Sequence, residues 1–377
     1  MHEDHERALK ALASRGRLRA LAPRRGVDFS SNDYLGLGSS AELAAVISAA
    51  IVRGVPVGAG GSRLLRGNDP EHETLEAEAQ HFFGGDTALY MGGGFAANTA
   101  IFSTLPQRGD IIVHDAFIHA SAHDGMRLSK AERIAASHND VNHFRDAIRA
   151  WRAQGGTGRV WIAVESLYSM EGDRAPLVDF DALARETDAM LVIDEAHATG
   201  VFGPEGRGLG HALEGQPHVV SLHTCGKALG VMGALVIAPR ILRDYLVNRA
   251  RPFIYATAPS PLMAAGVRAA LALSSSAPER REALHDRIGL FGDALQRHCG
   301  MPPTGTQIQP IIVKSDAKAV MIAEALQRQG FDVRAVRPPT VPEGTARLRV
   351  SLTLNASTDD TMSLVAALSR ELERTGP

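Results

Sequence analysis

The sequence has little cysteine, almost no net charge and no long hydrophobic run. Its two cysteines, Cys225 and Cys299, make neither a disulfide framework nor a zinc cluster. The chain has 40 lysine and arginine residues and 42 aspartate and glutamate residues, which gives a formal net charge of −2. This balance gives no indication of a basic surface that would bind nucleic acid or an anionic membrane. No apolar run is long enough to span a bilayer, and the charged N-terminus lacks the apolar core of a secretory signal. We therefore predict a cytoplasmic protein without nucleic-acid or membrane partners.

Short apolar runs alternate with amphipathic stretches in the middle of the 377-residue chain. The amphipathic stretches, such as residues 75–83 and 178–186, have the periodicity of surface helices. Short apolar strands separated by helices are typical of a mostly parallel sheet that is covered on both faces. We predict a three-layer α/β domain of helices, sheet and helices, with strands at residues 87–91, 111–114, 160–165, 190–194, 219–223 and 233–238.

The C-terminal third has a different pattern. A helical stretch at 317–329 lies among apolar segments at 311–313, 333–336 and 347–352, and a closing helix runs to about residue 374. This order predicts a small α+β domain with an antiparallel sheet. We expect residues 46–275 to form the large domain and residues 276–377 the small one, which residues 1–45 join.

Asp194 ends one of the predicted strands, and His197 follows three residues later. Ligands of open α/β sheets lie at the carboxyl ends of strands, and an aspartate there can keep a pyridinium nitrogen protonated, which makes a cofactor an electron sink. An aspartate that only caps the next turn fits the segment equally well. The letters Asp-Glu-Ala-His also occur in nucleotide-dependent helicases, but the chain lacks a Walker-type phosphate loop.

Lys227 follows the next predicted strand and lies 33 residues after Asp194. Glycines on both sides of it would let the backbone approach a bulky cofactor, as a Schiff-base lysine requires. Thr224, three residues earlier, could donate to a phosphate group. A solvated loop lysine is the alternative, and it is the usual fate of lysine. The position one strand after Asp194 favours the Schiff-base interpretation.

Three further segments also follow predicted strands. The glycine-rich turn that ends at Gly94 and Phe95 would present backbone N–H groups and a helix N-terminus to an anion, although a simple tight turn has the same composition. His119 could stack on a flat heteroaromatic ring, or it could be a structural histidine. Ser169 could donate to a phenolic oxygen, or it could belong to an ordinary turn.

Arg347 and Arg349 alternate with apolar residues and so point to one face of a predicted strand. A buried arginine on that face would make a bidentate clamp for a carboxylate. Two surface arginines on an edge strand are the alternative interpretation.

The order of glycine-rich turn, histidine, serine, Asp-x-x-His, Thr-x-x-Lys and late arginine resembles the α-oxoamine synthases, which are fold-type I pyridoxal-phosphate enzymes. The resemblance covers nearly the whole chain and includes the segments 29–38 and 58–68. It implies an aminotransferase-like fold, pyridoxal 5'-phosphate as the cofactor and no metal. It also implies a homodimer with active sites at the interface. We expect the loop 58–68 of each subunit to contribute to the active site of its neighbour.

The resemblance implies roles for individual residues. Lys227 would form the Schiff base and act as a general base, Asp194 would keep the ring nitrogen protonated, and His119, the third catalytic residue, would stack on the ring and meet the substrate. The other cofactor contacts would be Gly94, Phe95, Ser169, His197 and Thr224. The substrate contacts would be Arg19, Asn32, Thr340 and Arg349, with Arg17 as an alternative to Arg19.

The activity that the resemblance implies is a decarboxylative condensation of an amino acid with an acyl thioester. The segment 337–349 is similar to the members that join L-alanine to a pimeloyl thioester in biotin biosynthesis, with the acyl group carried on coenzyme A or on an acyl-carrier protein. Members of the glycine C-acetyltransferase, 5-aminolevulinate synthase and serine palmitoyltransferase types stay open as alternatives, as does a non-catalytic relative that binds the cofactor or a partner.

Overall fold

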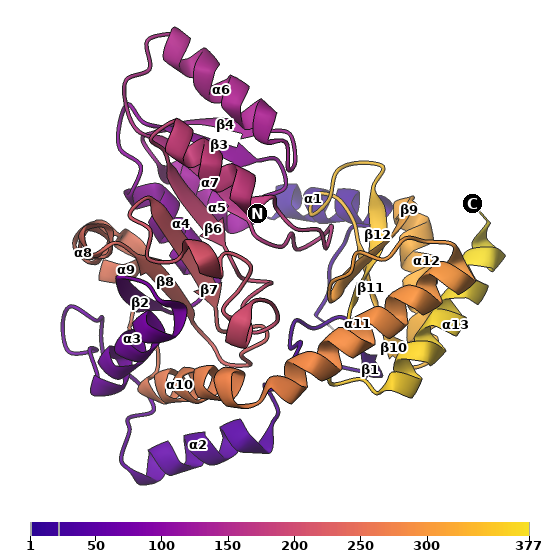
Figure 1. Ribbon diagram of the computed structural model, residues 1–377. Helices are drawn as coiled ribbons and strands as arrows, with labels where there is room; N and C mark the ends of the chain where they lie inside the picture. The colour runs from indigo at the N-terminus through magenta and orange to yellow at the C-terminus, as the bar shows by residue number, and fades with distance from the viewer. Residues whose placement is uncertain (1, 22, 377) are drawn as a thin grey trace. The chain divides into compact units, whose positions relative to one another are not determined.

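Two compact units make up the computed structural model, which describes residues 2–21 and 23–376. The large unit comprises residues 35–168 and 174–281, and the small unit comprises residues 2–34, 169–173 and 282–376. The chain crosses between the two units four times, the last time inside helix α11 (Pro278–Cys299). Figure 1 labels the elements of both units. The domain limits expected from the sequence, at residues 45 and 275, stay a prediction.

A seven-stranded sheet is the middle layer of the large unit, with the strand order β2-β8-β7-β6-β5-β3-β4. Strand β8 pairs antiparallel with both of its neighbours, and the other six strands run in one direction. The strands are β2 (Thr87–Met91), β3 (Ile111–Asp115), β4 (Glu132–Ala136), β5 (Val160–Glu165), β6 (Met190–Asp194), β7 (Val219–Thr224) and β8 (Ala234–Ala238).

Helix α3 shows how the local sequence sets the limits of a helix. It begins with Pro70 after Asp69, whose side chain accepts a hydrogen bond from the N–H of Glu71 (2.9 Å). It ends at Phe83 and is capped by Gly84 in the left-handed conformation (φ 79°). The α-helices that lie wholly in the large unit are α2 (Ala41–Val52), α3 (Pro70–Phe83), α4 (Gly94–Thr104), α5 (Ala120–Leu128), α6 (Val141–Ala153), α7 (Leu177–Glu186), α8 (Arg240–Arg249), α9 (Arg251–Ile254) and α10 (Pro261–Ser276).

Apolar cores cover the two faces of the sheet, because successive side chains of a strand point in opposite directions. Ile112 and Trp161 pack with α4 and α5 on one face, whereas Val113 and Ile162 pack with α6 and α7 on the other. Figure 1 shows these helices beside the strands that they cover. The prediction of a mostly parallel sheet with helices on both faces is confirmed.

The six predicted strands are present, each within one residue of its predicted limits at either end. Strand β4, at the edge of the sheet, is missing from the prediction. Four of its five residues are exposed, so its sequence lacks the apolar run by which the other strands are recognised.

The small unit contains a three-stranded antiparallel sheet in the order β11-β12-β9 and a two-stranded parallel pair of β1 with β10. This pair builds the N-terminal segment into the C-terminal part of the chain, and the expected small α+β fold is confirmed. The elements are α1 (Glu3–Ser14), β1 (Val27–Asp28), β9 (Ile308–Lys314), α12 (Asp316–Arg328), β10 (Phe331–Asp332), β11 (Arg334–Val336), β12 (Ala346–Ser351) and α13 (Thr358–Thr375).

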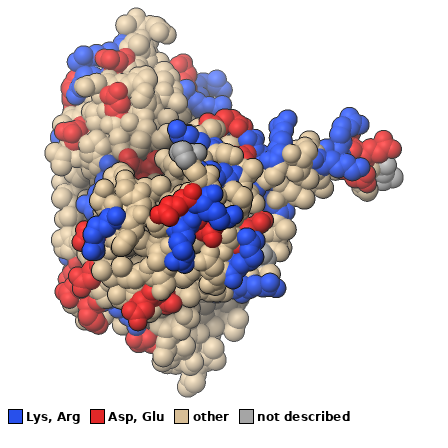
Figure 2. Space-filling view, turned by 90° about the vertical axis from the view of Figure 1, so that its right-hand side faces the viewer, with Lys and Arg blue, Asp and Glu red and all other residues tan. Residues whose placement is uncertain are grey.

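Acidic and basic side chains are interspersed on the face drawn in Figure 2. In the part of the chain that the structure describes, no helix is both long enough and apolar enough to cross a membrane. Residues 2–21 and 23–376 also contain no group of three or more His, Cys, Asp or Glu side chains that could hold a metal ion.

Candidate active site

Four of the predicted site residues lie where strands of the large unit end. Asp194 is the last residue of β6 and Thr224 is the last residue of β7. His119 lies between β3 and α5, and Gly94 is the first residue of α4 after β2. Since β2, β3, β6 and β7 run in the same direction, their carboxyl ends meet at one edge of the sheet, which is where α/β folds bind ligands.

Asp194 is a buried carboxylate that is held by neutral donors. Its Oδ1 accepts a hydrogen bond from the N–H of Ala196 (2.9 Å), and its Oδ2 accepts one from Nδ2 of Asn98 on α4 (2.7 Å). Among the described residues no basic side chain forms an ion pair with it. The contact with Ala196 is the turn cap considered above, but the bond from Asn98 shows that capping is not the only use of this side chain. A buried carboxylate with neutral partners can stabilise a cation that binds beside it.

Lys227 and His197 come together from the loops that follow β7 and β6. The Nζ of Lys227 lies 2.9 Å from Nε2 of His197, which is buried. Two backbone hydrogen bonds of 2.9 Å, from the N–H of Gly230 to Lys227 O and from the N–H of Val231 to Cys225 O, close the loop that carries the lysine. Lys227 is therefore half-buried and oriented by the site, unlike the solvated loop lysine that was the alternative.

Gly94 lets the N-terminus of α4 approach the end of β7. A Cβ at this position would lie 2.5 Å from Cγ2 of Thr224, which is closer than real Cβ contacts allow. The first N–H groups of a helix have no partner within the helix, and they attract anions. The hydroxyl of Thr224 donates to Ala196 O (3.2 Å), and Phe95 in the first turn is 55% exposed. The missing side chain of Gly94 therefore places the first N–H groups of α4 close to Thr224 at the end of β7.

Asp115, the last residue of β3, holds the segment that leads to His119. Its carboxylate accepts hydrogen bonds from the ring of His138 (2.9 Å) and from the N–H groups of Asn139 (2.7 Å) and Phe117 (2.8 Å). Burial raises the pKa of this carboxyl, but the donors outweigh burial, so the pKa of Asp115 lies below its ordinary value. The ionised carboxylate fixes the backbone four residues before His119.

Arg349 on β12 is buried in the small unit, and its partners are all neutral. In the described part of the chain no carboxylate pairs with it. Its guanidinium donates to Ser169 O (2.6 Å), Ser351 Oγ (2.6 Å), Asn32 Oδ1 (3.1 Å) and Tyr34 Oη (3.4 Å). A buried cation with neutral partners is a site for an anion.

Arg347, two residues earlier on the same strand, is buried in a different way. Its Nη1 pairs with Oε1 of Glu171 (2.9 Å) and also donates to Met170 O (3.1 Å). The charge of Arg347 is therefore balanced within the small unit, whereas that of Arg349 is not. Neither is the surface arginine that the sequence left open as an alternative, because both are less than a tenth exposed.

Arg19 and Arg17 also differ in their partners. The Nη2 of Arg19 donates to the hydroxyl of Thr340 (3.1 Å), so the structure brings these two predicted substrate contacts together. Arg17 instead forms ion pairs with Asp316 (2.8 Å) and Glu343 (2.7 Å). A cavity of about 210 Å³ lies here in the small unit, lined by Arg17, Arg19, Thr340 and residues 335–338.

Ser169 is the one predicted cofactor contact that lies in the small unit, within the segment 169–173. The sequence analysis missed two polar residues that contact the candidate site, Asn98 and Ser121, which are 2% and 1% exposed. The sequence does contain one signal for Asn98, which is a polar residue within an apolar helical stretch of alanines and phenylalanines.

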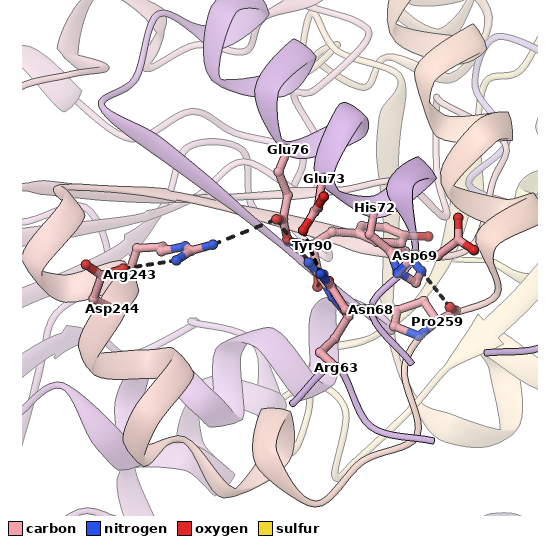
Figure 3. A network of polar contacts seen from close by, with 10 residues as sticks. All are labelled: Arg63, Asn68, Asp69, His72, Glu73, Glu76, Tyr90, Arg243, Asp244 and Pro259. Atoms are coloured by element: carbon pink, nitrogen blue, oxygen red, sulfur yellow. Dashed lines mark hydrogen bonds and ion pairs between the residues drawn. The ribbon is translucent and has the colours of Figure 1, made fainter. Parts of the chain in front are cut away.

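A buried ion pair ties the predicted interface loop, residues 58–68, to α3. Arg63 in the loop pairs with Glu76 on the helix (2.8 Å), and Glu76 also accepts the N–H of Tyr90 on β2 (2.9 Å). Figure 3 shows this pair at the centre of a polar network that extends to Pro259 and Arg243.

The chain is similar to known proteins over most of its length. Residues 24–368 match the family described as aminotransferase class I and II. The 8-amino-7-oxononanoate synthase of Chromobacterium violaceum is 42% identical over 352 residues, which cover 92% of this chain and 89% of that protein.

Two solved structures give the same indication. That of 8-amino-7-oxononanoate synthase from Francisella tularensis has a TM-score of 0.78 and 28% identity, and the match covers 93% of this chain and 98% of that one. A structure of SPT (serine palmitoyltransferase) with a PLP internal aldimine has a TM-score of 0.88 and 25% identity, with 100% of this chain and 98% of that chain covered.

Proposed function

This chain belongs to the class I and II aminotransferase family and to its α-oxoamine synthase branch, and on that premise we propose that it is a pyridoxal-phosphate-dependent acyltransferase that makes 8-amino-7-oxononanoate. Its substrates would be L-alanine and a pimeloyl thioester. A carbon–carbon bond forms between Cα of the amino acid and the thioester carbonyl, the thiol leaves, the amino-acid carboxylate departs as carbon dioxide, and a proton takes its place at Cα. The predicted fold class and cofactor are confirmed by the family and by the relatives that contain PLP.

The residues of the large unit fit pyridoxal phosphate. The phosphate matches the N-terminus of α4, which the missing side chain of Gly94 allows to lie against Thr224. The ring nitrogen matches Asp194, a buried carboxylate whose partners among the described residues are neutral donors. The aldehyde matches Lys227, which the contact with His197 orients. Bound here, the cofactor supplies an electron sink for negative charge at Cα of the amino acid.

The side chains of the chain itself would carry the protons and the charges. The Nζ of Lys227 is the base that takes the Cα proton, and His197 at 2.9 Å fixes its direction. The carboxylate of Asp194 would stabilise a cationic ring nitrogen beside it. His119 meets the acyl carbonyl. The contact between Lys227 and His197, three residues after the buried Asp194, is the observation that carries the assignment of the catalytic centre.

Arg349 and Asn32 would bind the carboxylate of L-alanine. The guanidinium of Arg349 is buried without an acidic partner, so an incoming carboxylate would balance a charge that the described protein leaves unbalanced. Arg349 already donates to Asn32 Oδ1 (3.1 Å), which holds the two side chains in one place. A planar guanidinium also offers the paired N–H groups that a carboxylate accepts best.

Arg19 and Thr340 would bind the far end of the acyl chain, since a pimeloyl group ends in a second carboxylate. Both line the same cavity. Arg17 is the weaker candidate because Asp316 and Glu343 already balance its charge. This assignment favours an acyl donor that ends in a carboxylate over an acetyl or a fatty acyl group.

A homodimer would complete the assembly, in the cytoplasm. The loop 58–68 is held rigidly by the buried pair of Arg63 and Glu76 (Figure 3) and by the hydrogen bond from Ala258 N–H to Gly61 O (2.9 Å). Its tip exposes 84% of Leu65 to solvent. Exposed apolar side chains on a rigid loop support association with another protein surface. We expect that surface to belong to a second copy of this chain.

The test is to record the visible absorbance of the purified holoenzyme while L-alanine, glycine and L-serine are added separately. Release of thiol is then followed with pimeloyl-coenzyme A and with pimeloyl-carrier protein. We expect a spectral response to L-alanine and thiol release with a pimeloyl donor. A response to glycine or serine together with other acyl donors would assign the chain to another member of the family. Lys227→Ala should remove both the lysine-linked absorbance and the turnover, and turnover in that variant would refute the role of Lys227.

A further inference from the structure

A chain of hydrogen bonds in the large unit connects the carboxylate at the end of β6 with the imidazole at the start of α5. The Nδ2 of Asn98 lies 2.7 Å from Oδ2 of Asp194 and 3.0 Å from Oγ of Ser121. The Oγ of Ser121 lies 2.7 Å from Nδ1 of His119, and the backbone N–H of Ser121 donates to the same nitrogen (3.2 Å). Asn98 and Ser121 have no other function in the proposed mechanism.

The carboxylate at one end and the backbone N–H of Ser121 at the other together determine the directions of the bonds in this chain. Both oxygens of an ionised Asp194 can only accept, so the Asn98 atom at 2.7 Å is the amide nitrogen. The same amide donates its second hydrogen to Oγ of Ser121, which leaves the hydroxyl hydrogen of Ser121 available to donate to Nδ1 of His119. The backbone N–H of Ser121 cannot reverse its role. The Nδ1 of His119 therefore faces two donors and carries no proton.

We infer that Asn98 and Ser121 are positioning residues, which hold His119 as the neutral tautomer with its proton on Nε2. The inference deepens the proposed function and rests on it for the identity of the acceptor, which is a carbonyl oxygen of the acyl donor or product. In this tautomer the group that His119 presents to a ligand is an N–H donor. His119 then polarises the carbonyl by donating a hydrogen bond and does not act as a base through Nδ1.

The charges around His119 agree with a neutral ring. Partial desolvation and the positive charge of Lys227 lower the pKa of His119, and the negative charge of Asp194 opposes this shift. The residue as a whole is solvent-accessible. Ionisation of Asp194 is what orients the amide of Asn98. A cationic ring nitrogen beside Asp194 would thus favour the same tautomer of His119 that donates to the substrate.

The packing of Asn98 also indicates that its amide is kept for this purpose. Asn98 is 2% exposed, and its Oδ1 is buried without a hydrogen-bond partner in the described structure. An unsatisfied buried polar atom costs about 1–3 kcal/mol, so an apolar residue would serve better if the position only filled space between α4 and α5. The donors of the amide, which contact Asp194 and Ser121, account for its presence.

The test reads the ring nitrogens of His119 directly by ¹⁵N NMR, in the cofactor-free protein and in the holoenzyme. His119→Gln assigns its signals among those of the 15 histidines. We expect Nδ1 of the wild type to be unprotonated and Nε2 to carry the proton near neutral pH. Ser121→Ala leaves Nδ1 only the longer bond from the backbone N–H of residue 121 (3.2 Å), so the preference for the Nε2-protonated form should weaken and the spectrum should show a mixture of tautomers. Ser121→Thr, which restores the hydroxyl, should recover the wild-type spectrum. Ser103→Ala, on α4 and outside the chain of bonds, is the matched control.

Activity provides a second readout. In Ser121→Ala and in Asn98→Leu we expect kcat to fall roughly 10- to 100-fold, as expected for a mispositioned proton donor, with KM for L-alanine changed less than about twofold. A wild-type Nδ1 that carries the proton, or tautomers that Ser121→Ala leaves unchanged, would overturn the inference. The NMR result needs no substrate, so an error in the proposed substrates would alter the kinetic result and leave the tautomer as stated.

Discussion

Arg349 and Arg347 lie two residues apart on β12, yet we expect the same substitution to affect them in different ways. The guanidinium of Arg349 has only neutral partners in the described structure, whereas that of Arg347 is paired with Glu171 at 2.9 Å. Lysine keeps the charge at both positions but loses the planar fork of donors. Arg349→Lys should therefore weaken the binding of the amino acid, and Arg347→Lys should lower the stability of the fold.

The magnitudes follow from the hydrogen bonds that each side chain makes. A hydrogen bond to a charged group contributes about 1.5–3 kcal/mol, and loss of one such bond to the carboxylate of L-alanine raises the dissociation constant roughly 10- to 150-fold. In Arg347→Lys the lost bonds are those to Glu171 and to backbone carbonyl groups. We expect a decrease of about 1–3 kcal/mol in the free energy of unfolding, with the dissociation constant changed less than about threefold.

The assay is a spectral titration of each holoenzyme with L-alanine in the absence of an acyl donor, so that binding is measured without turnover. Chemical denaturation of the same preparations gives the free energy of unfolding. Equal weakening of L-alanine binding in the two variants would refute the reasoning, because a charge balanced by Glu171 and one without an acidic partner would then have behaved alike. An unchanged dissociation constant in Arg349→Lys would remove that residue from the amino-acid site.

Three further predictions follow from other parts of the structure. Gly94→Ala should raise the dissociation constant of pyridoxal phosphate at least tenfold in a fluorescence titration, because the new Cβ would lie 2.5 Å from the Thr224 methyl group. In the control Gly92→Ala the new Cβ has no atom within 4 Å, so this variant should bind pyridoxal phosphate normally. Glu76→Gln should lower the free energy of unfolding, measured in denaturant, by about 3–5 kcal/mol, because it leaves the buried guanidinium of Arg63 without its counter-charge. A loss smaller than about 1 kcal/mol would contradict this expectation. Folding lowers the pKa of Asp115, so the stabilisation from its carboxylate should be complete above about pH 4 and should disappear at lower pH. The unfolding curves of wild type and Asp115→Asn should therefore converge at low pH. A difference in stability between the two proteins that stays constant with pH would count against the pKa shift.

Much of the large unit was predictable from the sequence because buried parallel strands have a clear apolar signature. The strands at Thr87–Met91, Val160–Glu165 and Met190–Asp194 have the limits that the apolar runs predicted. The strand at Glu132–Ala136 was not predictable in this way, since it lies at the sheet edge and exposes most of its side chains. The reversed direction of the strand at Ala234–Ala238 also depends on pairing that no local pattern encodes.

The candidate site was predictable for residues whose side-chain chemistry and position after a predicted strand both indicate a role in a site. Asp194, His119 and Lys227 are of this kind, and their roles remain proposals. Asn98 and Ser121 are not, because an asparagine or a serine within a helix becomes informative only when its hydrogen-bond partners are known. The choice between two neighbouring arginines, whether on β12 or near the N-terminus, likewise needed the positions of acidic residues that are distant in sequence.

The parallel pair of β1 with β10 has a consequence for how the chain folds as it is made. Val27 pairs with Phe331, which the ribosome adds 304 residues later. At about 5–20 residues per second, the N-terminal segment waits roughly 15–60 s before its partner strand exists. The large unit, by contrast, contains no residue beyond 281. Arg19 and Asn32 belong to the waiting segment, so the nascent protein should acquire the parts that hold the cofactor well before it acquires the parts that choose the substrate.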